Sequence, residues 1–130
     1  MISVAFAKCV ENPERRWRAA NWVGHCLFDD MAALAADDPE VTQALLVADS
    51  HQILLLDDEE RACNRELVER LESLLRRVVK ATLSTTEDSH RLKWHEKLED
   101  EWREQYLIAI QELAALLEAE DKYRRQQQQR

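Results

Sequence analysis

The chain has 130 residues, of which 45% are hydrophobic and 34% charged, and its formal net charge is −8 at pH 7. This mixture is typical of amphipathic helices in one folded domain and excludes a largely disordered chain. The negative charge excludes direct binding to nucleic acid, because phosphates must be neutralised by Lys and Arg. No run is long and apolar enough to predict a membrane span, so we expect no membrane partner.

The scarcity of turn-forming residues predicts the fold class. There are one glycine and two prolines, whereas strand-rich folds use both at hairpins, bulges and tight turns. Both prolines follow a helix-capping residue, in Asn12-Pro13 and Asp38-Pro39, which is the pattern of a helix N-terminus. We therefore expect an all-α fold: an antiparallel bundle of four to five helices with a long C-terminal helix. A single helical domain is expected over residues 1–125, followed by a disordered polar tail over 126–130.

Two helices are predicted in the first 36 residues. Residues 2–10 are mostly apolar and indicate a short helix that covers a larger core. Residues 13–36 place apolar side chains at three- and four-residue steps, the pattern of one buried helical stripe: Trp17, Ala20, Gly24, Leu27, Phe28, Met31 and Leu34. Because Gly disfavours a helix by about 1 kcal/mol relative to Ala, Gly24 on this stripe indicates the close approach of another helix.

The middle of the chain predicts two further helices. Residues 39–56 form one of them, and its end, Ile53 to Leu56, is apolar on all sides. We expect this end to be deeply buried or in contact with a partner. Asp57-Asp58 then predicts the cap of a helix over 59–83. Its inner face consists of Leu67, Leu71, Leu74, Leu75, Val78 and Val79.

The last predicted helix is too long for a compact chain of this size. Residues 87–125 contain no Gly or Pro, and a helix of this length measures about 58 Å. The radius of gyration of a compact chain is only about 14 Å. Either the helix breaks near Tyr106, or its far half packs against another molecule. We favour a homodimer, with contacts made by Tyr106, Leu113, Leu117 and Tyr123.

The acidic charge is concentrated in one stretch. Residues 19–60 hold ten Asp and Glu and no Lys or Arg, which favours a protein partner with a basic surface. The acids expected to bind that partner are Asp29, Asp30, Asp57 and Asp58.

The four tryptophans divide by helical phase. Trp17 and Trp102 fall on the predicted stripes and are expected in the core. Trp22 and Trp94 fall off the stripes, and Trp is enriched at the energetic centres of protein interfaces. We therefore predict that Trp22 and Trp94 bind the partner.

No pattern predicts a catalytic, cofactor-binding or metal-binding residue. Zinc sites use paired Cys and His ligands, which are missing here, and Glu87-x-x-His90 lacks the second such pair that a di-iron bundle needs. The Glu-x-x-Glu spacings at 66–72 and 96–99 only partly match the magnesium ligands of helical nucleotide pyrophosphatases. Three widely spaced cysteines and no export signal indicate reduced thiols and a cytoplasmic protein.

The sequence therefore predicts a small acidic helical protein-protein interaction module, dimeric and non-enzymatic, of the adaptor, chaperone, immunity or regulatory type. One alternative is an acidic nucleic-acid mimic that inhibits a DNA-binding protein. The other is a metal-dependent helical nucleotide hydrolase.

Overall fold

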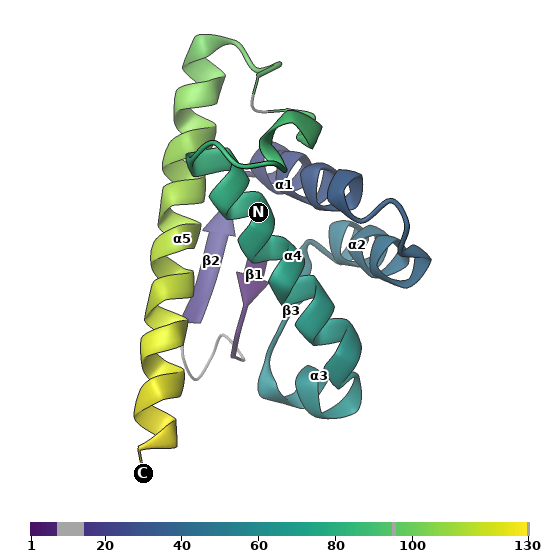
Figure 1. Cartoon of the computed structure of the whole chain (residues 1–130), viewed down its shortest axis with the longest axis vertical. Coiled ribbons are helices and arrows are strands. Elements are labelled where there is room, and N and C mark those ends of the chain that lie inside the picture. Colours follow the sequence, from purple (N-terminus) through teal and green to yellow (C-terminus); the bar gives the residue numbers. More distant parts are fainter. Residues whose placement is uncertain (8–14, 95, 130) are drawn as a thin grey trace.

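The computed structural model describes residues 1–7, 15–94 and 96–129. Within them the chain is mixed α/β, so the prediction of an all-α bundle is wrong. Three strands form one sheet in the order β2-β1-β3 (Figure 1). Strand β1 (Ile2–Ala5) is antiparallel to β2 (Arg16–Ala19) and parallel to β3 (Ile53–Leu55).

Helices surround this small sheet. They are α1 (Asn21–Leu34), α2 (Pro39–His51), α3 (Asp58–Cys63), α4 (Arg65–Leu83), the 3₁₀ helix η2 (Ser89–Arg91) and α5 (Asp100–Gln128). In Figure 1, α4 crosses in front of β1, α5 runs the height of the molecule beside β2, and α1 and α2 lie on the opposite side from α5. None of the helices in the described residues is long and apolar enough to cross a membrane.

Three predicted helical segments are strands. Residues 2–5, 16–19 and 53–55 are four residues long or fewer, and apolar runs this short fit a strand as well as a helix. In β2, Trp17 and Ala19 are buried while Arg18 between them is exposed, which is the two-residue period of a strand. Residues 8–10 and the predicted cap at Asn12-Pro13 lie outside the described residues.

The glycine and proline argument fails because of how the strands are connected. β1 and β3 are parallel, and the chain between β2 and β3 runs through α1 and α2. A helical crossover of this kind needs no tight hairpin turn. Only the β1–β2 connection joins antiparallel neighbours within the sheet, so a sheet forms with little need for turn residues.

The predicted caps of two helices are confirmed. The Asp38 carboxylate accepts a hydrogen bond from the Val41 N–H at 3.2 Å, with Pro39 in the first turn of α2. The Asp57 carboxylate accepts one from the Glu60 N–H at 3.1 Å and caps α3. Each side chain supplies an acceptor to a backbone donor that the helix leaves unpaired.

The C-terminal helix is continuous but starts later than predicted. Residues 87–94 and 96–99 form turns and η2 instead of α-helix, so the prediction of one helix from residue 87 is wrong there. From Asp100 onward α5 does not break near Tyr106. Its apolar stripe packs against α4 and β2 of the same chain; the stripe is Tyr106, Ile110, Leu113, Leu116 and Leu117.

Gly24 of α1 lies directly against strand β1. A Cβ atom at Gly24 would stand 2.5 Å from three side-chain atoms of Ile2, which is itself fully buried. The predicted close approach therefore exists, but the neighbour is a strand and not a helix. Because Ile2 lies in the central strand, the missing side chain lets α1 settle on the sheet.

Replacing Gly24 with Ala is expected to lower the free energy of unfolding by about 1 kcal/mol. Overpacking a core costs about 1–3 kcal/mol, and the better helix propensity of Ala returns up to about 1 kcal/mol. Urea unfolding of Gly24→Ala, Ile2→Ala and the double variant measures the coupling. The Gly24→Ala penalty should shrink in the Ile2→Ala background; an unchanged penalty contradicts the close approach.

Candidate functional site

Four of the predicted partner-binding residues lie at one corner, where the segment after η2 crosses α1. The indole Nε1 of Trp94 donates to Asp29 Oδ2 at 3.1 Å. The backbone N–H of Lys93 donates to Asp30 Oδ1 at 2.6 Å. Trp22 and Trp94 are both partly buried and pack against the core. These side chains therefore anchor the segment after η2 to α1.

Trp17 lies in the environment predicted for it, whereas Trp102 does not. Trp17 is buried as predicted, and its indole donates to the Ala109 carbonyl at 2.9 Å. Trp102, predicted in the core, is 46% exposed, because it lies one turn before the buried stripe of α5 begins. Trp22 packs edge-on against Trp102, with ring centroids 5.3 Å apart, and lies 6.3 Å from the Tyr106 ring.

Asp30 is the chemically unusual residue of this corner. It is fully buried, and its Oδ2 and the Tyr106 hydroxyl are neighbours that have no other hydrogen-bond partner among the described residues. Burial raises the pKa of Asp30, although the N–H groups of Lys93 and Trp94 oppose this. Burial likewise raises the pKa of Tyr106 above its ordinary range and that of the Cys26 thiol to about 11. The corner therefore favours uncharged side chains.

The residues assigned to a dimer contact lie on α5. Tyr106, Leu113 and Leu117 are buried in the core of the same chain, so they offer no free surface to a second copy. Tyr123 is 37% exposed, and the Arg15 guanidinium lies over its ring at 4.2 Å from the centroid. The homodimer stays a prediction that these positions do not test.

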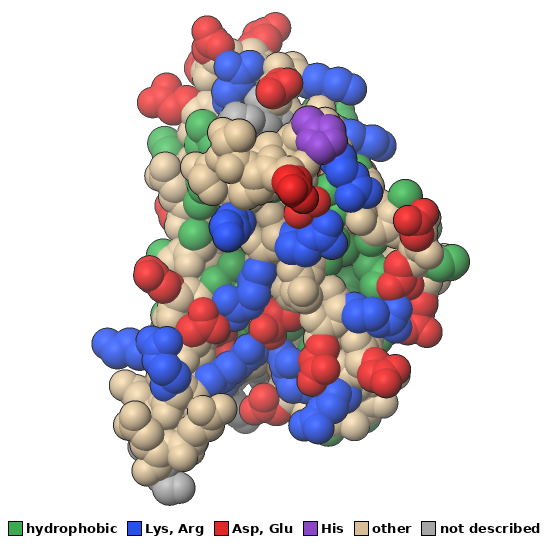
Figure 2. Space-filling model, viewed as in Figure 1, with side chains coloured by type: hydrophobic (Ala, Val, Ile, Leu, Met, Phe, Trp, Pro, Cys, Tyr) green, Lys and Arg blue, Asp and Glu red, His purple; other side chains and the backbone are tan. Residues whose placement is uncertain are grey.

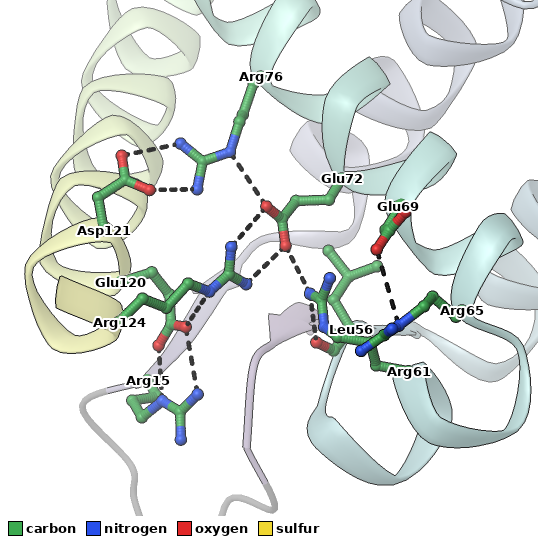
Figure 3. Close-up of polar contacts among 10 residues, drawn as sticks. All are labelled: Arg15, Leu56, Arg61, Arg65, Glu69, Glu72, Arg76, Glu120, Asp121 and Arg124. Atoms are coloured by element: carbon green, nitrogen blue, oxygen red, sulfur yellow. Dashed lines mark hydrogen bonds and ion pairs between the residues drawn. The ribbon is translucent and has the colours of Figure 1, made fainter. Parts of the chain in front are cut away.

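A dense ionic cluster joins α3, α4 and α5 (Figure 3). At its centre the Glu72 carboxylate accepts hydrogen bonds from Arg124 at 2.7 and 2.8 Å, from Arg61 at 2.6 Å and from Arg76 at 3.3 Å. Burial opposes ionisation of Glu72, but the guanidinium groups of Arg124 and Arg61 outweigh it and lower its pKa to about 2.

The outer members of the cluster are also paired. Arg76 binds both carboxylate oxygens of Asp121, at 2.9 and 3.0 Å. Arg15 reaches the buried carboxylate of Glu120 at 2.6 and 3.2 Å, and Figure 3 shows these groups converging between α4 and α5. The guanidinium groups are thus occupied by carboxylates of the same chain. We interpret the cluster as a brace between helices and not as an anion-binding site.

An open apolar groove lies on the other side of α4. It encloses about 540 Å³, with α2, β3, the end of α3 and α4 as its walls. Its lining is mostly aliphatic, and it comprises Ala44, Val47, Ala48, His51, Ile53, Leu54, Leu55, Glu60, Asn64, Leu67, Val68 and Leu71. Val47 and Leu55 are 47% and 39% exposed. Figure 2 shows the opposite face of α4, where charged side chains surround small hydrophobic patches.

Strand β3 is the open edge of the sheet, and it forms one wall of the groove. The Ser3 N–H donates to the Gln52 carbonyl at 3.0 Å, and the Leu56 N–H to the Ala5 carbonyl at 2.8 Å. Since bonding to β1 alternates along the strand, the backbone groups of Ile53 and Leu55 point away from β1. The opposite edge, β2, lies against α5, a helix cover that blocks further strand pairing.

The segment that forms the α2, β3 and α3 walls of the groove is acidic, whereas α4, the remaining wall, also carries arginines. From residue 39 to residue 60 there is no Lys or Arg, and there are six acids. Glu60 lines the groove, and Asp58 is exposed in the first turn of α3. Asp57 is buried as the cap of α3, so of the two predicted partner-binding acids here, Asp58 faces solvent.

The described residues contain no group of three or more His, Cys, Asp or Glu side chains placed to hold a metal ion. Glu72, the last residue of one Glu-x-x-Glu pattern, is held by three arginines. Glu99 stands at the start of α5, outside the helix.

The groove was missed as a site because its walls come from separate elements. The sequence did mark Ile53 to Leu56 as an apolar cluster that is buried or in contact with a partner. However, a helical interpretation of these residues conceals their open backbone edge. The non-glycine residue Gln52, with φ of 61°, ends α2 just before β3, and Gln at this left-handed position carries no sequence signal.

Comparisons with known proteins do not identify the chain. No protein-family model matches it, and no curated protein or solved structure shows significant similarity to it.

Replacing Glu72 with Gln is expected to lower the free energy of unfolding by about 3 kcal/mol at pH 7, because partly buried arginines lose their counter-charge. The folded pKa of Glu72 is about 2, below the unfolded value of about 4.3. Its contribution is therefore present above about pH 5 and is lost as the pH falls toward 2. Urea unfolding at pH 7 and pH 3 should show a smaller penalty at pH 3.

The matched control is Glu69→Gln, in the same helix. Glu69 is exposed and its nearest guanidinium, that of Arg65, is 3.9 Å away, so its replacement should change stability by less than about 0.5 kcal/mol. If the two substitutions change the free energy of unfolding equally, the interpretation of the ionic cluster as a brace between helices is wrong.

Replacing Asp30 with Asn is expected to stabilise the protein at pH 7 by about 1 kcal/mol. Asn retains an oxygen for the Lys93 N–H and adds N–H donors beside the Tyr106 hydroxyl. Because the folded pKa of Asp30 is raised, wild-type stability falls as the pH rises through the ordinary carboxyl range toward that folded pKa. The advantage of Asp30→Asn should therefore grow with pH in thermal unfolding, and Asp30→Ala should destabilise. If Asp30→Asn is less stable than the wild type by an amount that does not change with pH, this prediction is wrong.

Proposed function

We propose that the protein is a non-enzymatic interaction module of the adaptor, chaperone, immunity or regulatory type, which binds another protein in the groove between α2, β3 and α4. The observation that carries this proposal is the pair of exposed apolar side chains, Val47 and Leu55, that line an open groove. Apolar side chains gathered at a concave surface mark interaction sites in soluble domains.

This groove has more support as the binding surface than the tryptophan corner. Trp94 is hydrogen-bonded to Asp29, and Trp22 is packed against the aromatic rings of α5. A partner would first have to displace these contacts. The groove needs no such rearrangement, since Val47 and Leu55 already face solvent.

The nucleic-acid mimic has less support, because imitation of phosphates needs free carboxylates. Asp38 and Glu40 both bind Arg70, and Asp49 contacts His25. The hydrolase has less support because Glu72, one of its proposed ligands, is neutralised by arginines.

The proposal includes a cytoplasmic location. Cys26 and Cys63 are free thiols in the described residues, which is usual in a reducing compartment. It also retains the homodimer as a prediction, for which light scattering at high micromolar concentration is the measurement.

Replacing Val47 with Lys is expected to weaken capture of the partner at least about tenfold, equivalent to about 1.4 kcal/mol. The substitution places a charge in an apolar contact and opposes a basic partner. The matched control is Ile108→Lys, since Ile108 is 50% exposed in α5 and does not line the groove. The measurement is quantitative co-purification from native lysate, followed by titration of the captured protein.

If capture of the partner survives Val47→Lys and is lost on Ile108→Lys, the interaction lies on α5 and the proposal that the groove binds the partner is wrong. Equal loss in both variants, with unchanged thermal unfolding, would also contradict it. Light scattering of both variants separates a lost partner from a lost homodimer.

A further inference from the structure

We infer that the partner enters the groove as an extended strand that pairs with the free edge of β3, with alternating apolar side chains and Lys or Arg at its ends. This inference rests on the proposed function and specifies how the groove binds. Strand addition to an open sheet edge is a general mode of peptide recognition, in which main-chain hydrogen bonds supply affinity and side-chain pockets supply specificity.

The first argument is the backbone of β3. The outward N–H and C=O groups of Ile53 and Leu55 have no partner among the described residues, while Gln52 and Leu56 bond to β1. These four outward groups match the spacing of an added strand. Because β1 already pairs on the other side, the added chain would become the fourth strand of the sheet, in the order β2-β1-β3-partner.

The second argument is the shape and polarity of the space beside this edge. Val47 and Ala48 of α2 and Leu67, Val68 and Leu71 of α4 line this space. Side chains of a strand alternate between its two faces. An extended segment with apolar residues at every second position would therefore direct all of them to one face, where they can enter the apolar groove.

The third argument is charge. Glu60 lines the groove, and the next residue, Arg61, is turned away toward Glu72 and the Leu56 carbonyl. A basic side chain at an end of the added strand would meet the Glu60 carboxylate. A second copy of the chain pairing edge to edge would carry the same net charge of −8, and like charges at an interface oppose association.

The inference predicts binding of a designed probe, the acetylated and amidated heptapeptide Lys-Val-Thr-Val-Thr-Val-Lys. Fluorescence polarisation should give a dissociation constant below about 1 mM, and hydrogen exchange should show protection of the Ile53 and Leu55 amides. Replacing both terminal Lys with Glu should weaken binding at least about tenfold, with a smaller difference in high salt.

Two N-methylated probes test the backbone pairing. In a strand, the N–H groups of alternate residues point to opposite sides, so methylation of the Thr amides and methylation of the Val amides block opposite edges. One of these peptides should lose binding and the other should retain it. Equal binding by both, or no binding by the unmethylated probe at about 1 mM, overturns the inference.

A variant of the protein tests the same main-chain hydrogen bonding between β3 and the probe. Leu55→Pro removes an outward N–H and leaves the N–H groups of Leu54 and Leu56 for β1, because Pro is tolerated at an edge strand. It should weaken probe binding about tenfold, as expected for a lost interface hydrogen bond. Leu55→Val keeps the N–H and should bind within about threefold of the wild type, and thermal unfolding should report both variants as folded.

The outcomes separate this inference from the proposed function. If the natural partner is lost on Val47→Lys but binds Leu55→Pro as tightly as Leu55→Val, the groove binds a protein in another way and strand addition is wrong. If Val47→Lys leaves capture of the partner unchanged, the proposed function itself fails.

Discussion

The pairing of β1 with β2, which follows it closely in the chain, and with β3, about 50 residues away, determines where everything else lies. All four residues of β1 are buried, so both faces and both edges of this strand need cover. β2 occupies one edge, with α5 beyond it, and β3 occupies the other. Gly24 permits α1 to approach Ile2 closely. The groove exists because β3, at the edge of the sheet, pairs only with β1 among the described residues.

The charged side chains are also distributed unevenly over the molecule. Arg61, Arg70, Arg76 and Arg77 each reach a carboxylate of the same chain, and Arg124 is bound to Glu72. The strong ion pairs therefore lie between helices, where a partly buried carboxylate such as Glu72 retains its charge. On the other side of α4, Glu60 adds a negative charge to the lining of the groove beside the open edge of the sheet.

The helical part of the fold could be predicted from the sequence because its signals are local. The apolar period of α4 and the caps at Asp38 and Asp57 need only neighbouring residues, and these were predicted correctly. The single helix predicted over 59–83 is instead divided at Asn64 into α3 and α4. The strands could not be predicted, because Ile2–Ala5 and Ile53–Leu55 become strands through pairing across about 50 residues. The groove depends on that pairing, so the sequence marked its apolar wall without revealing its open edge.

The order of the strands also has a consequence for synthesis on the ribosome. β2 is made soon after β1, but β3 is made about 50 residues behind β1. At about 5–20 residues per second, the pair of β1 and β2 waits roughly 2–10 s with one side of β1 unpaired. During this interval the nascent chain displays an apolar strand edge, which is a natural point for chaperone capture or for aggregation between neighbouring chains on a polysome.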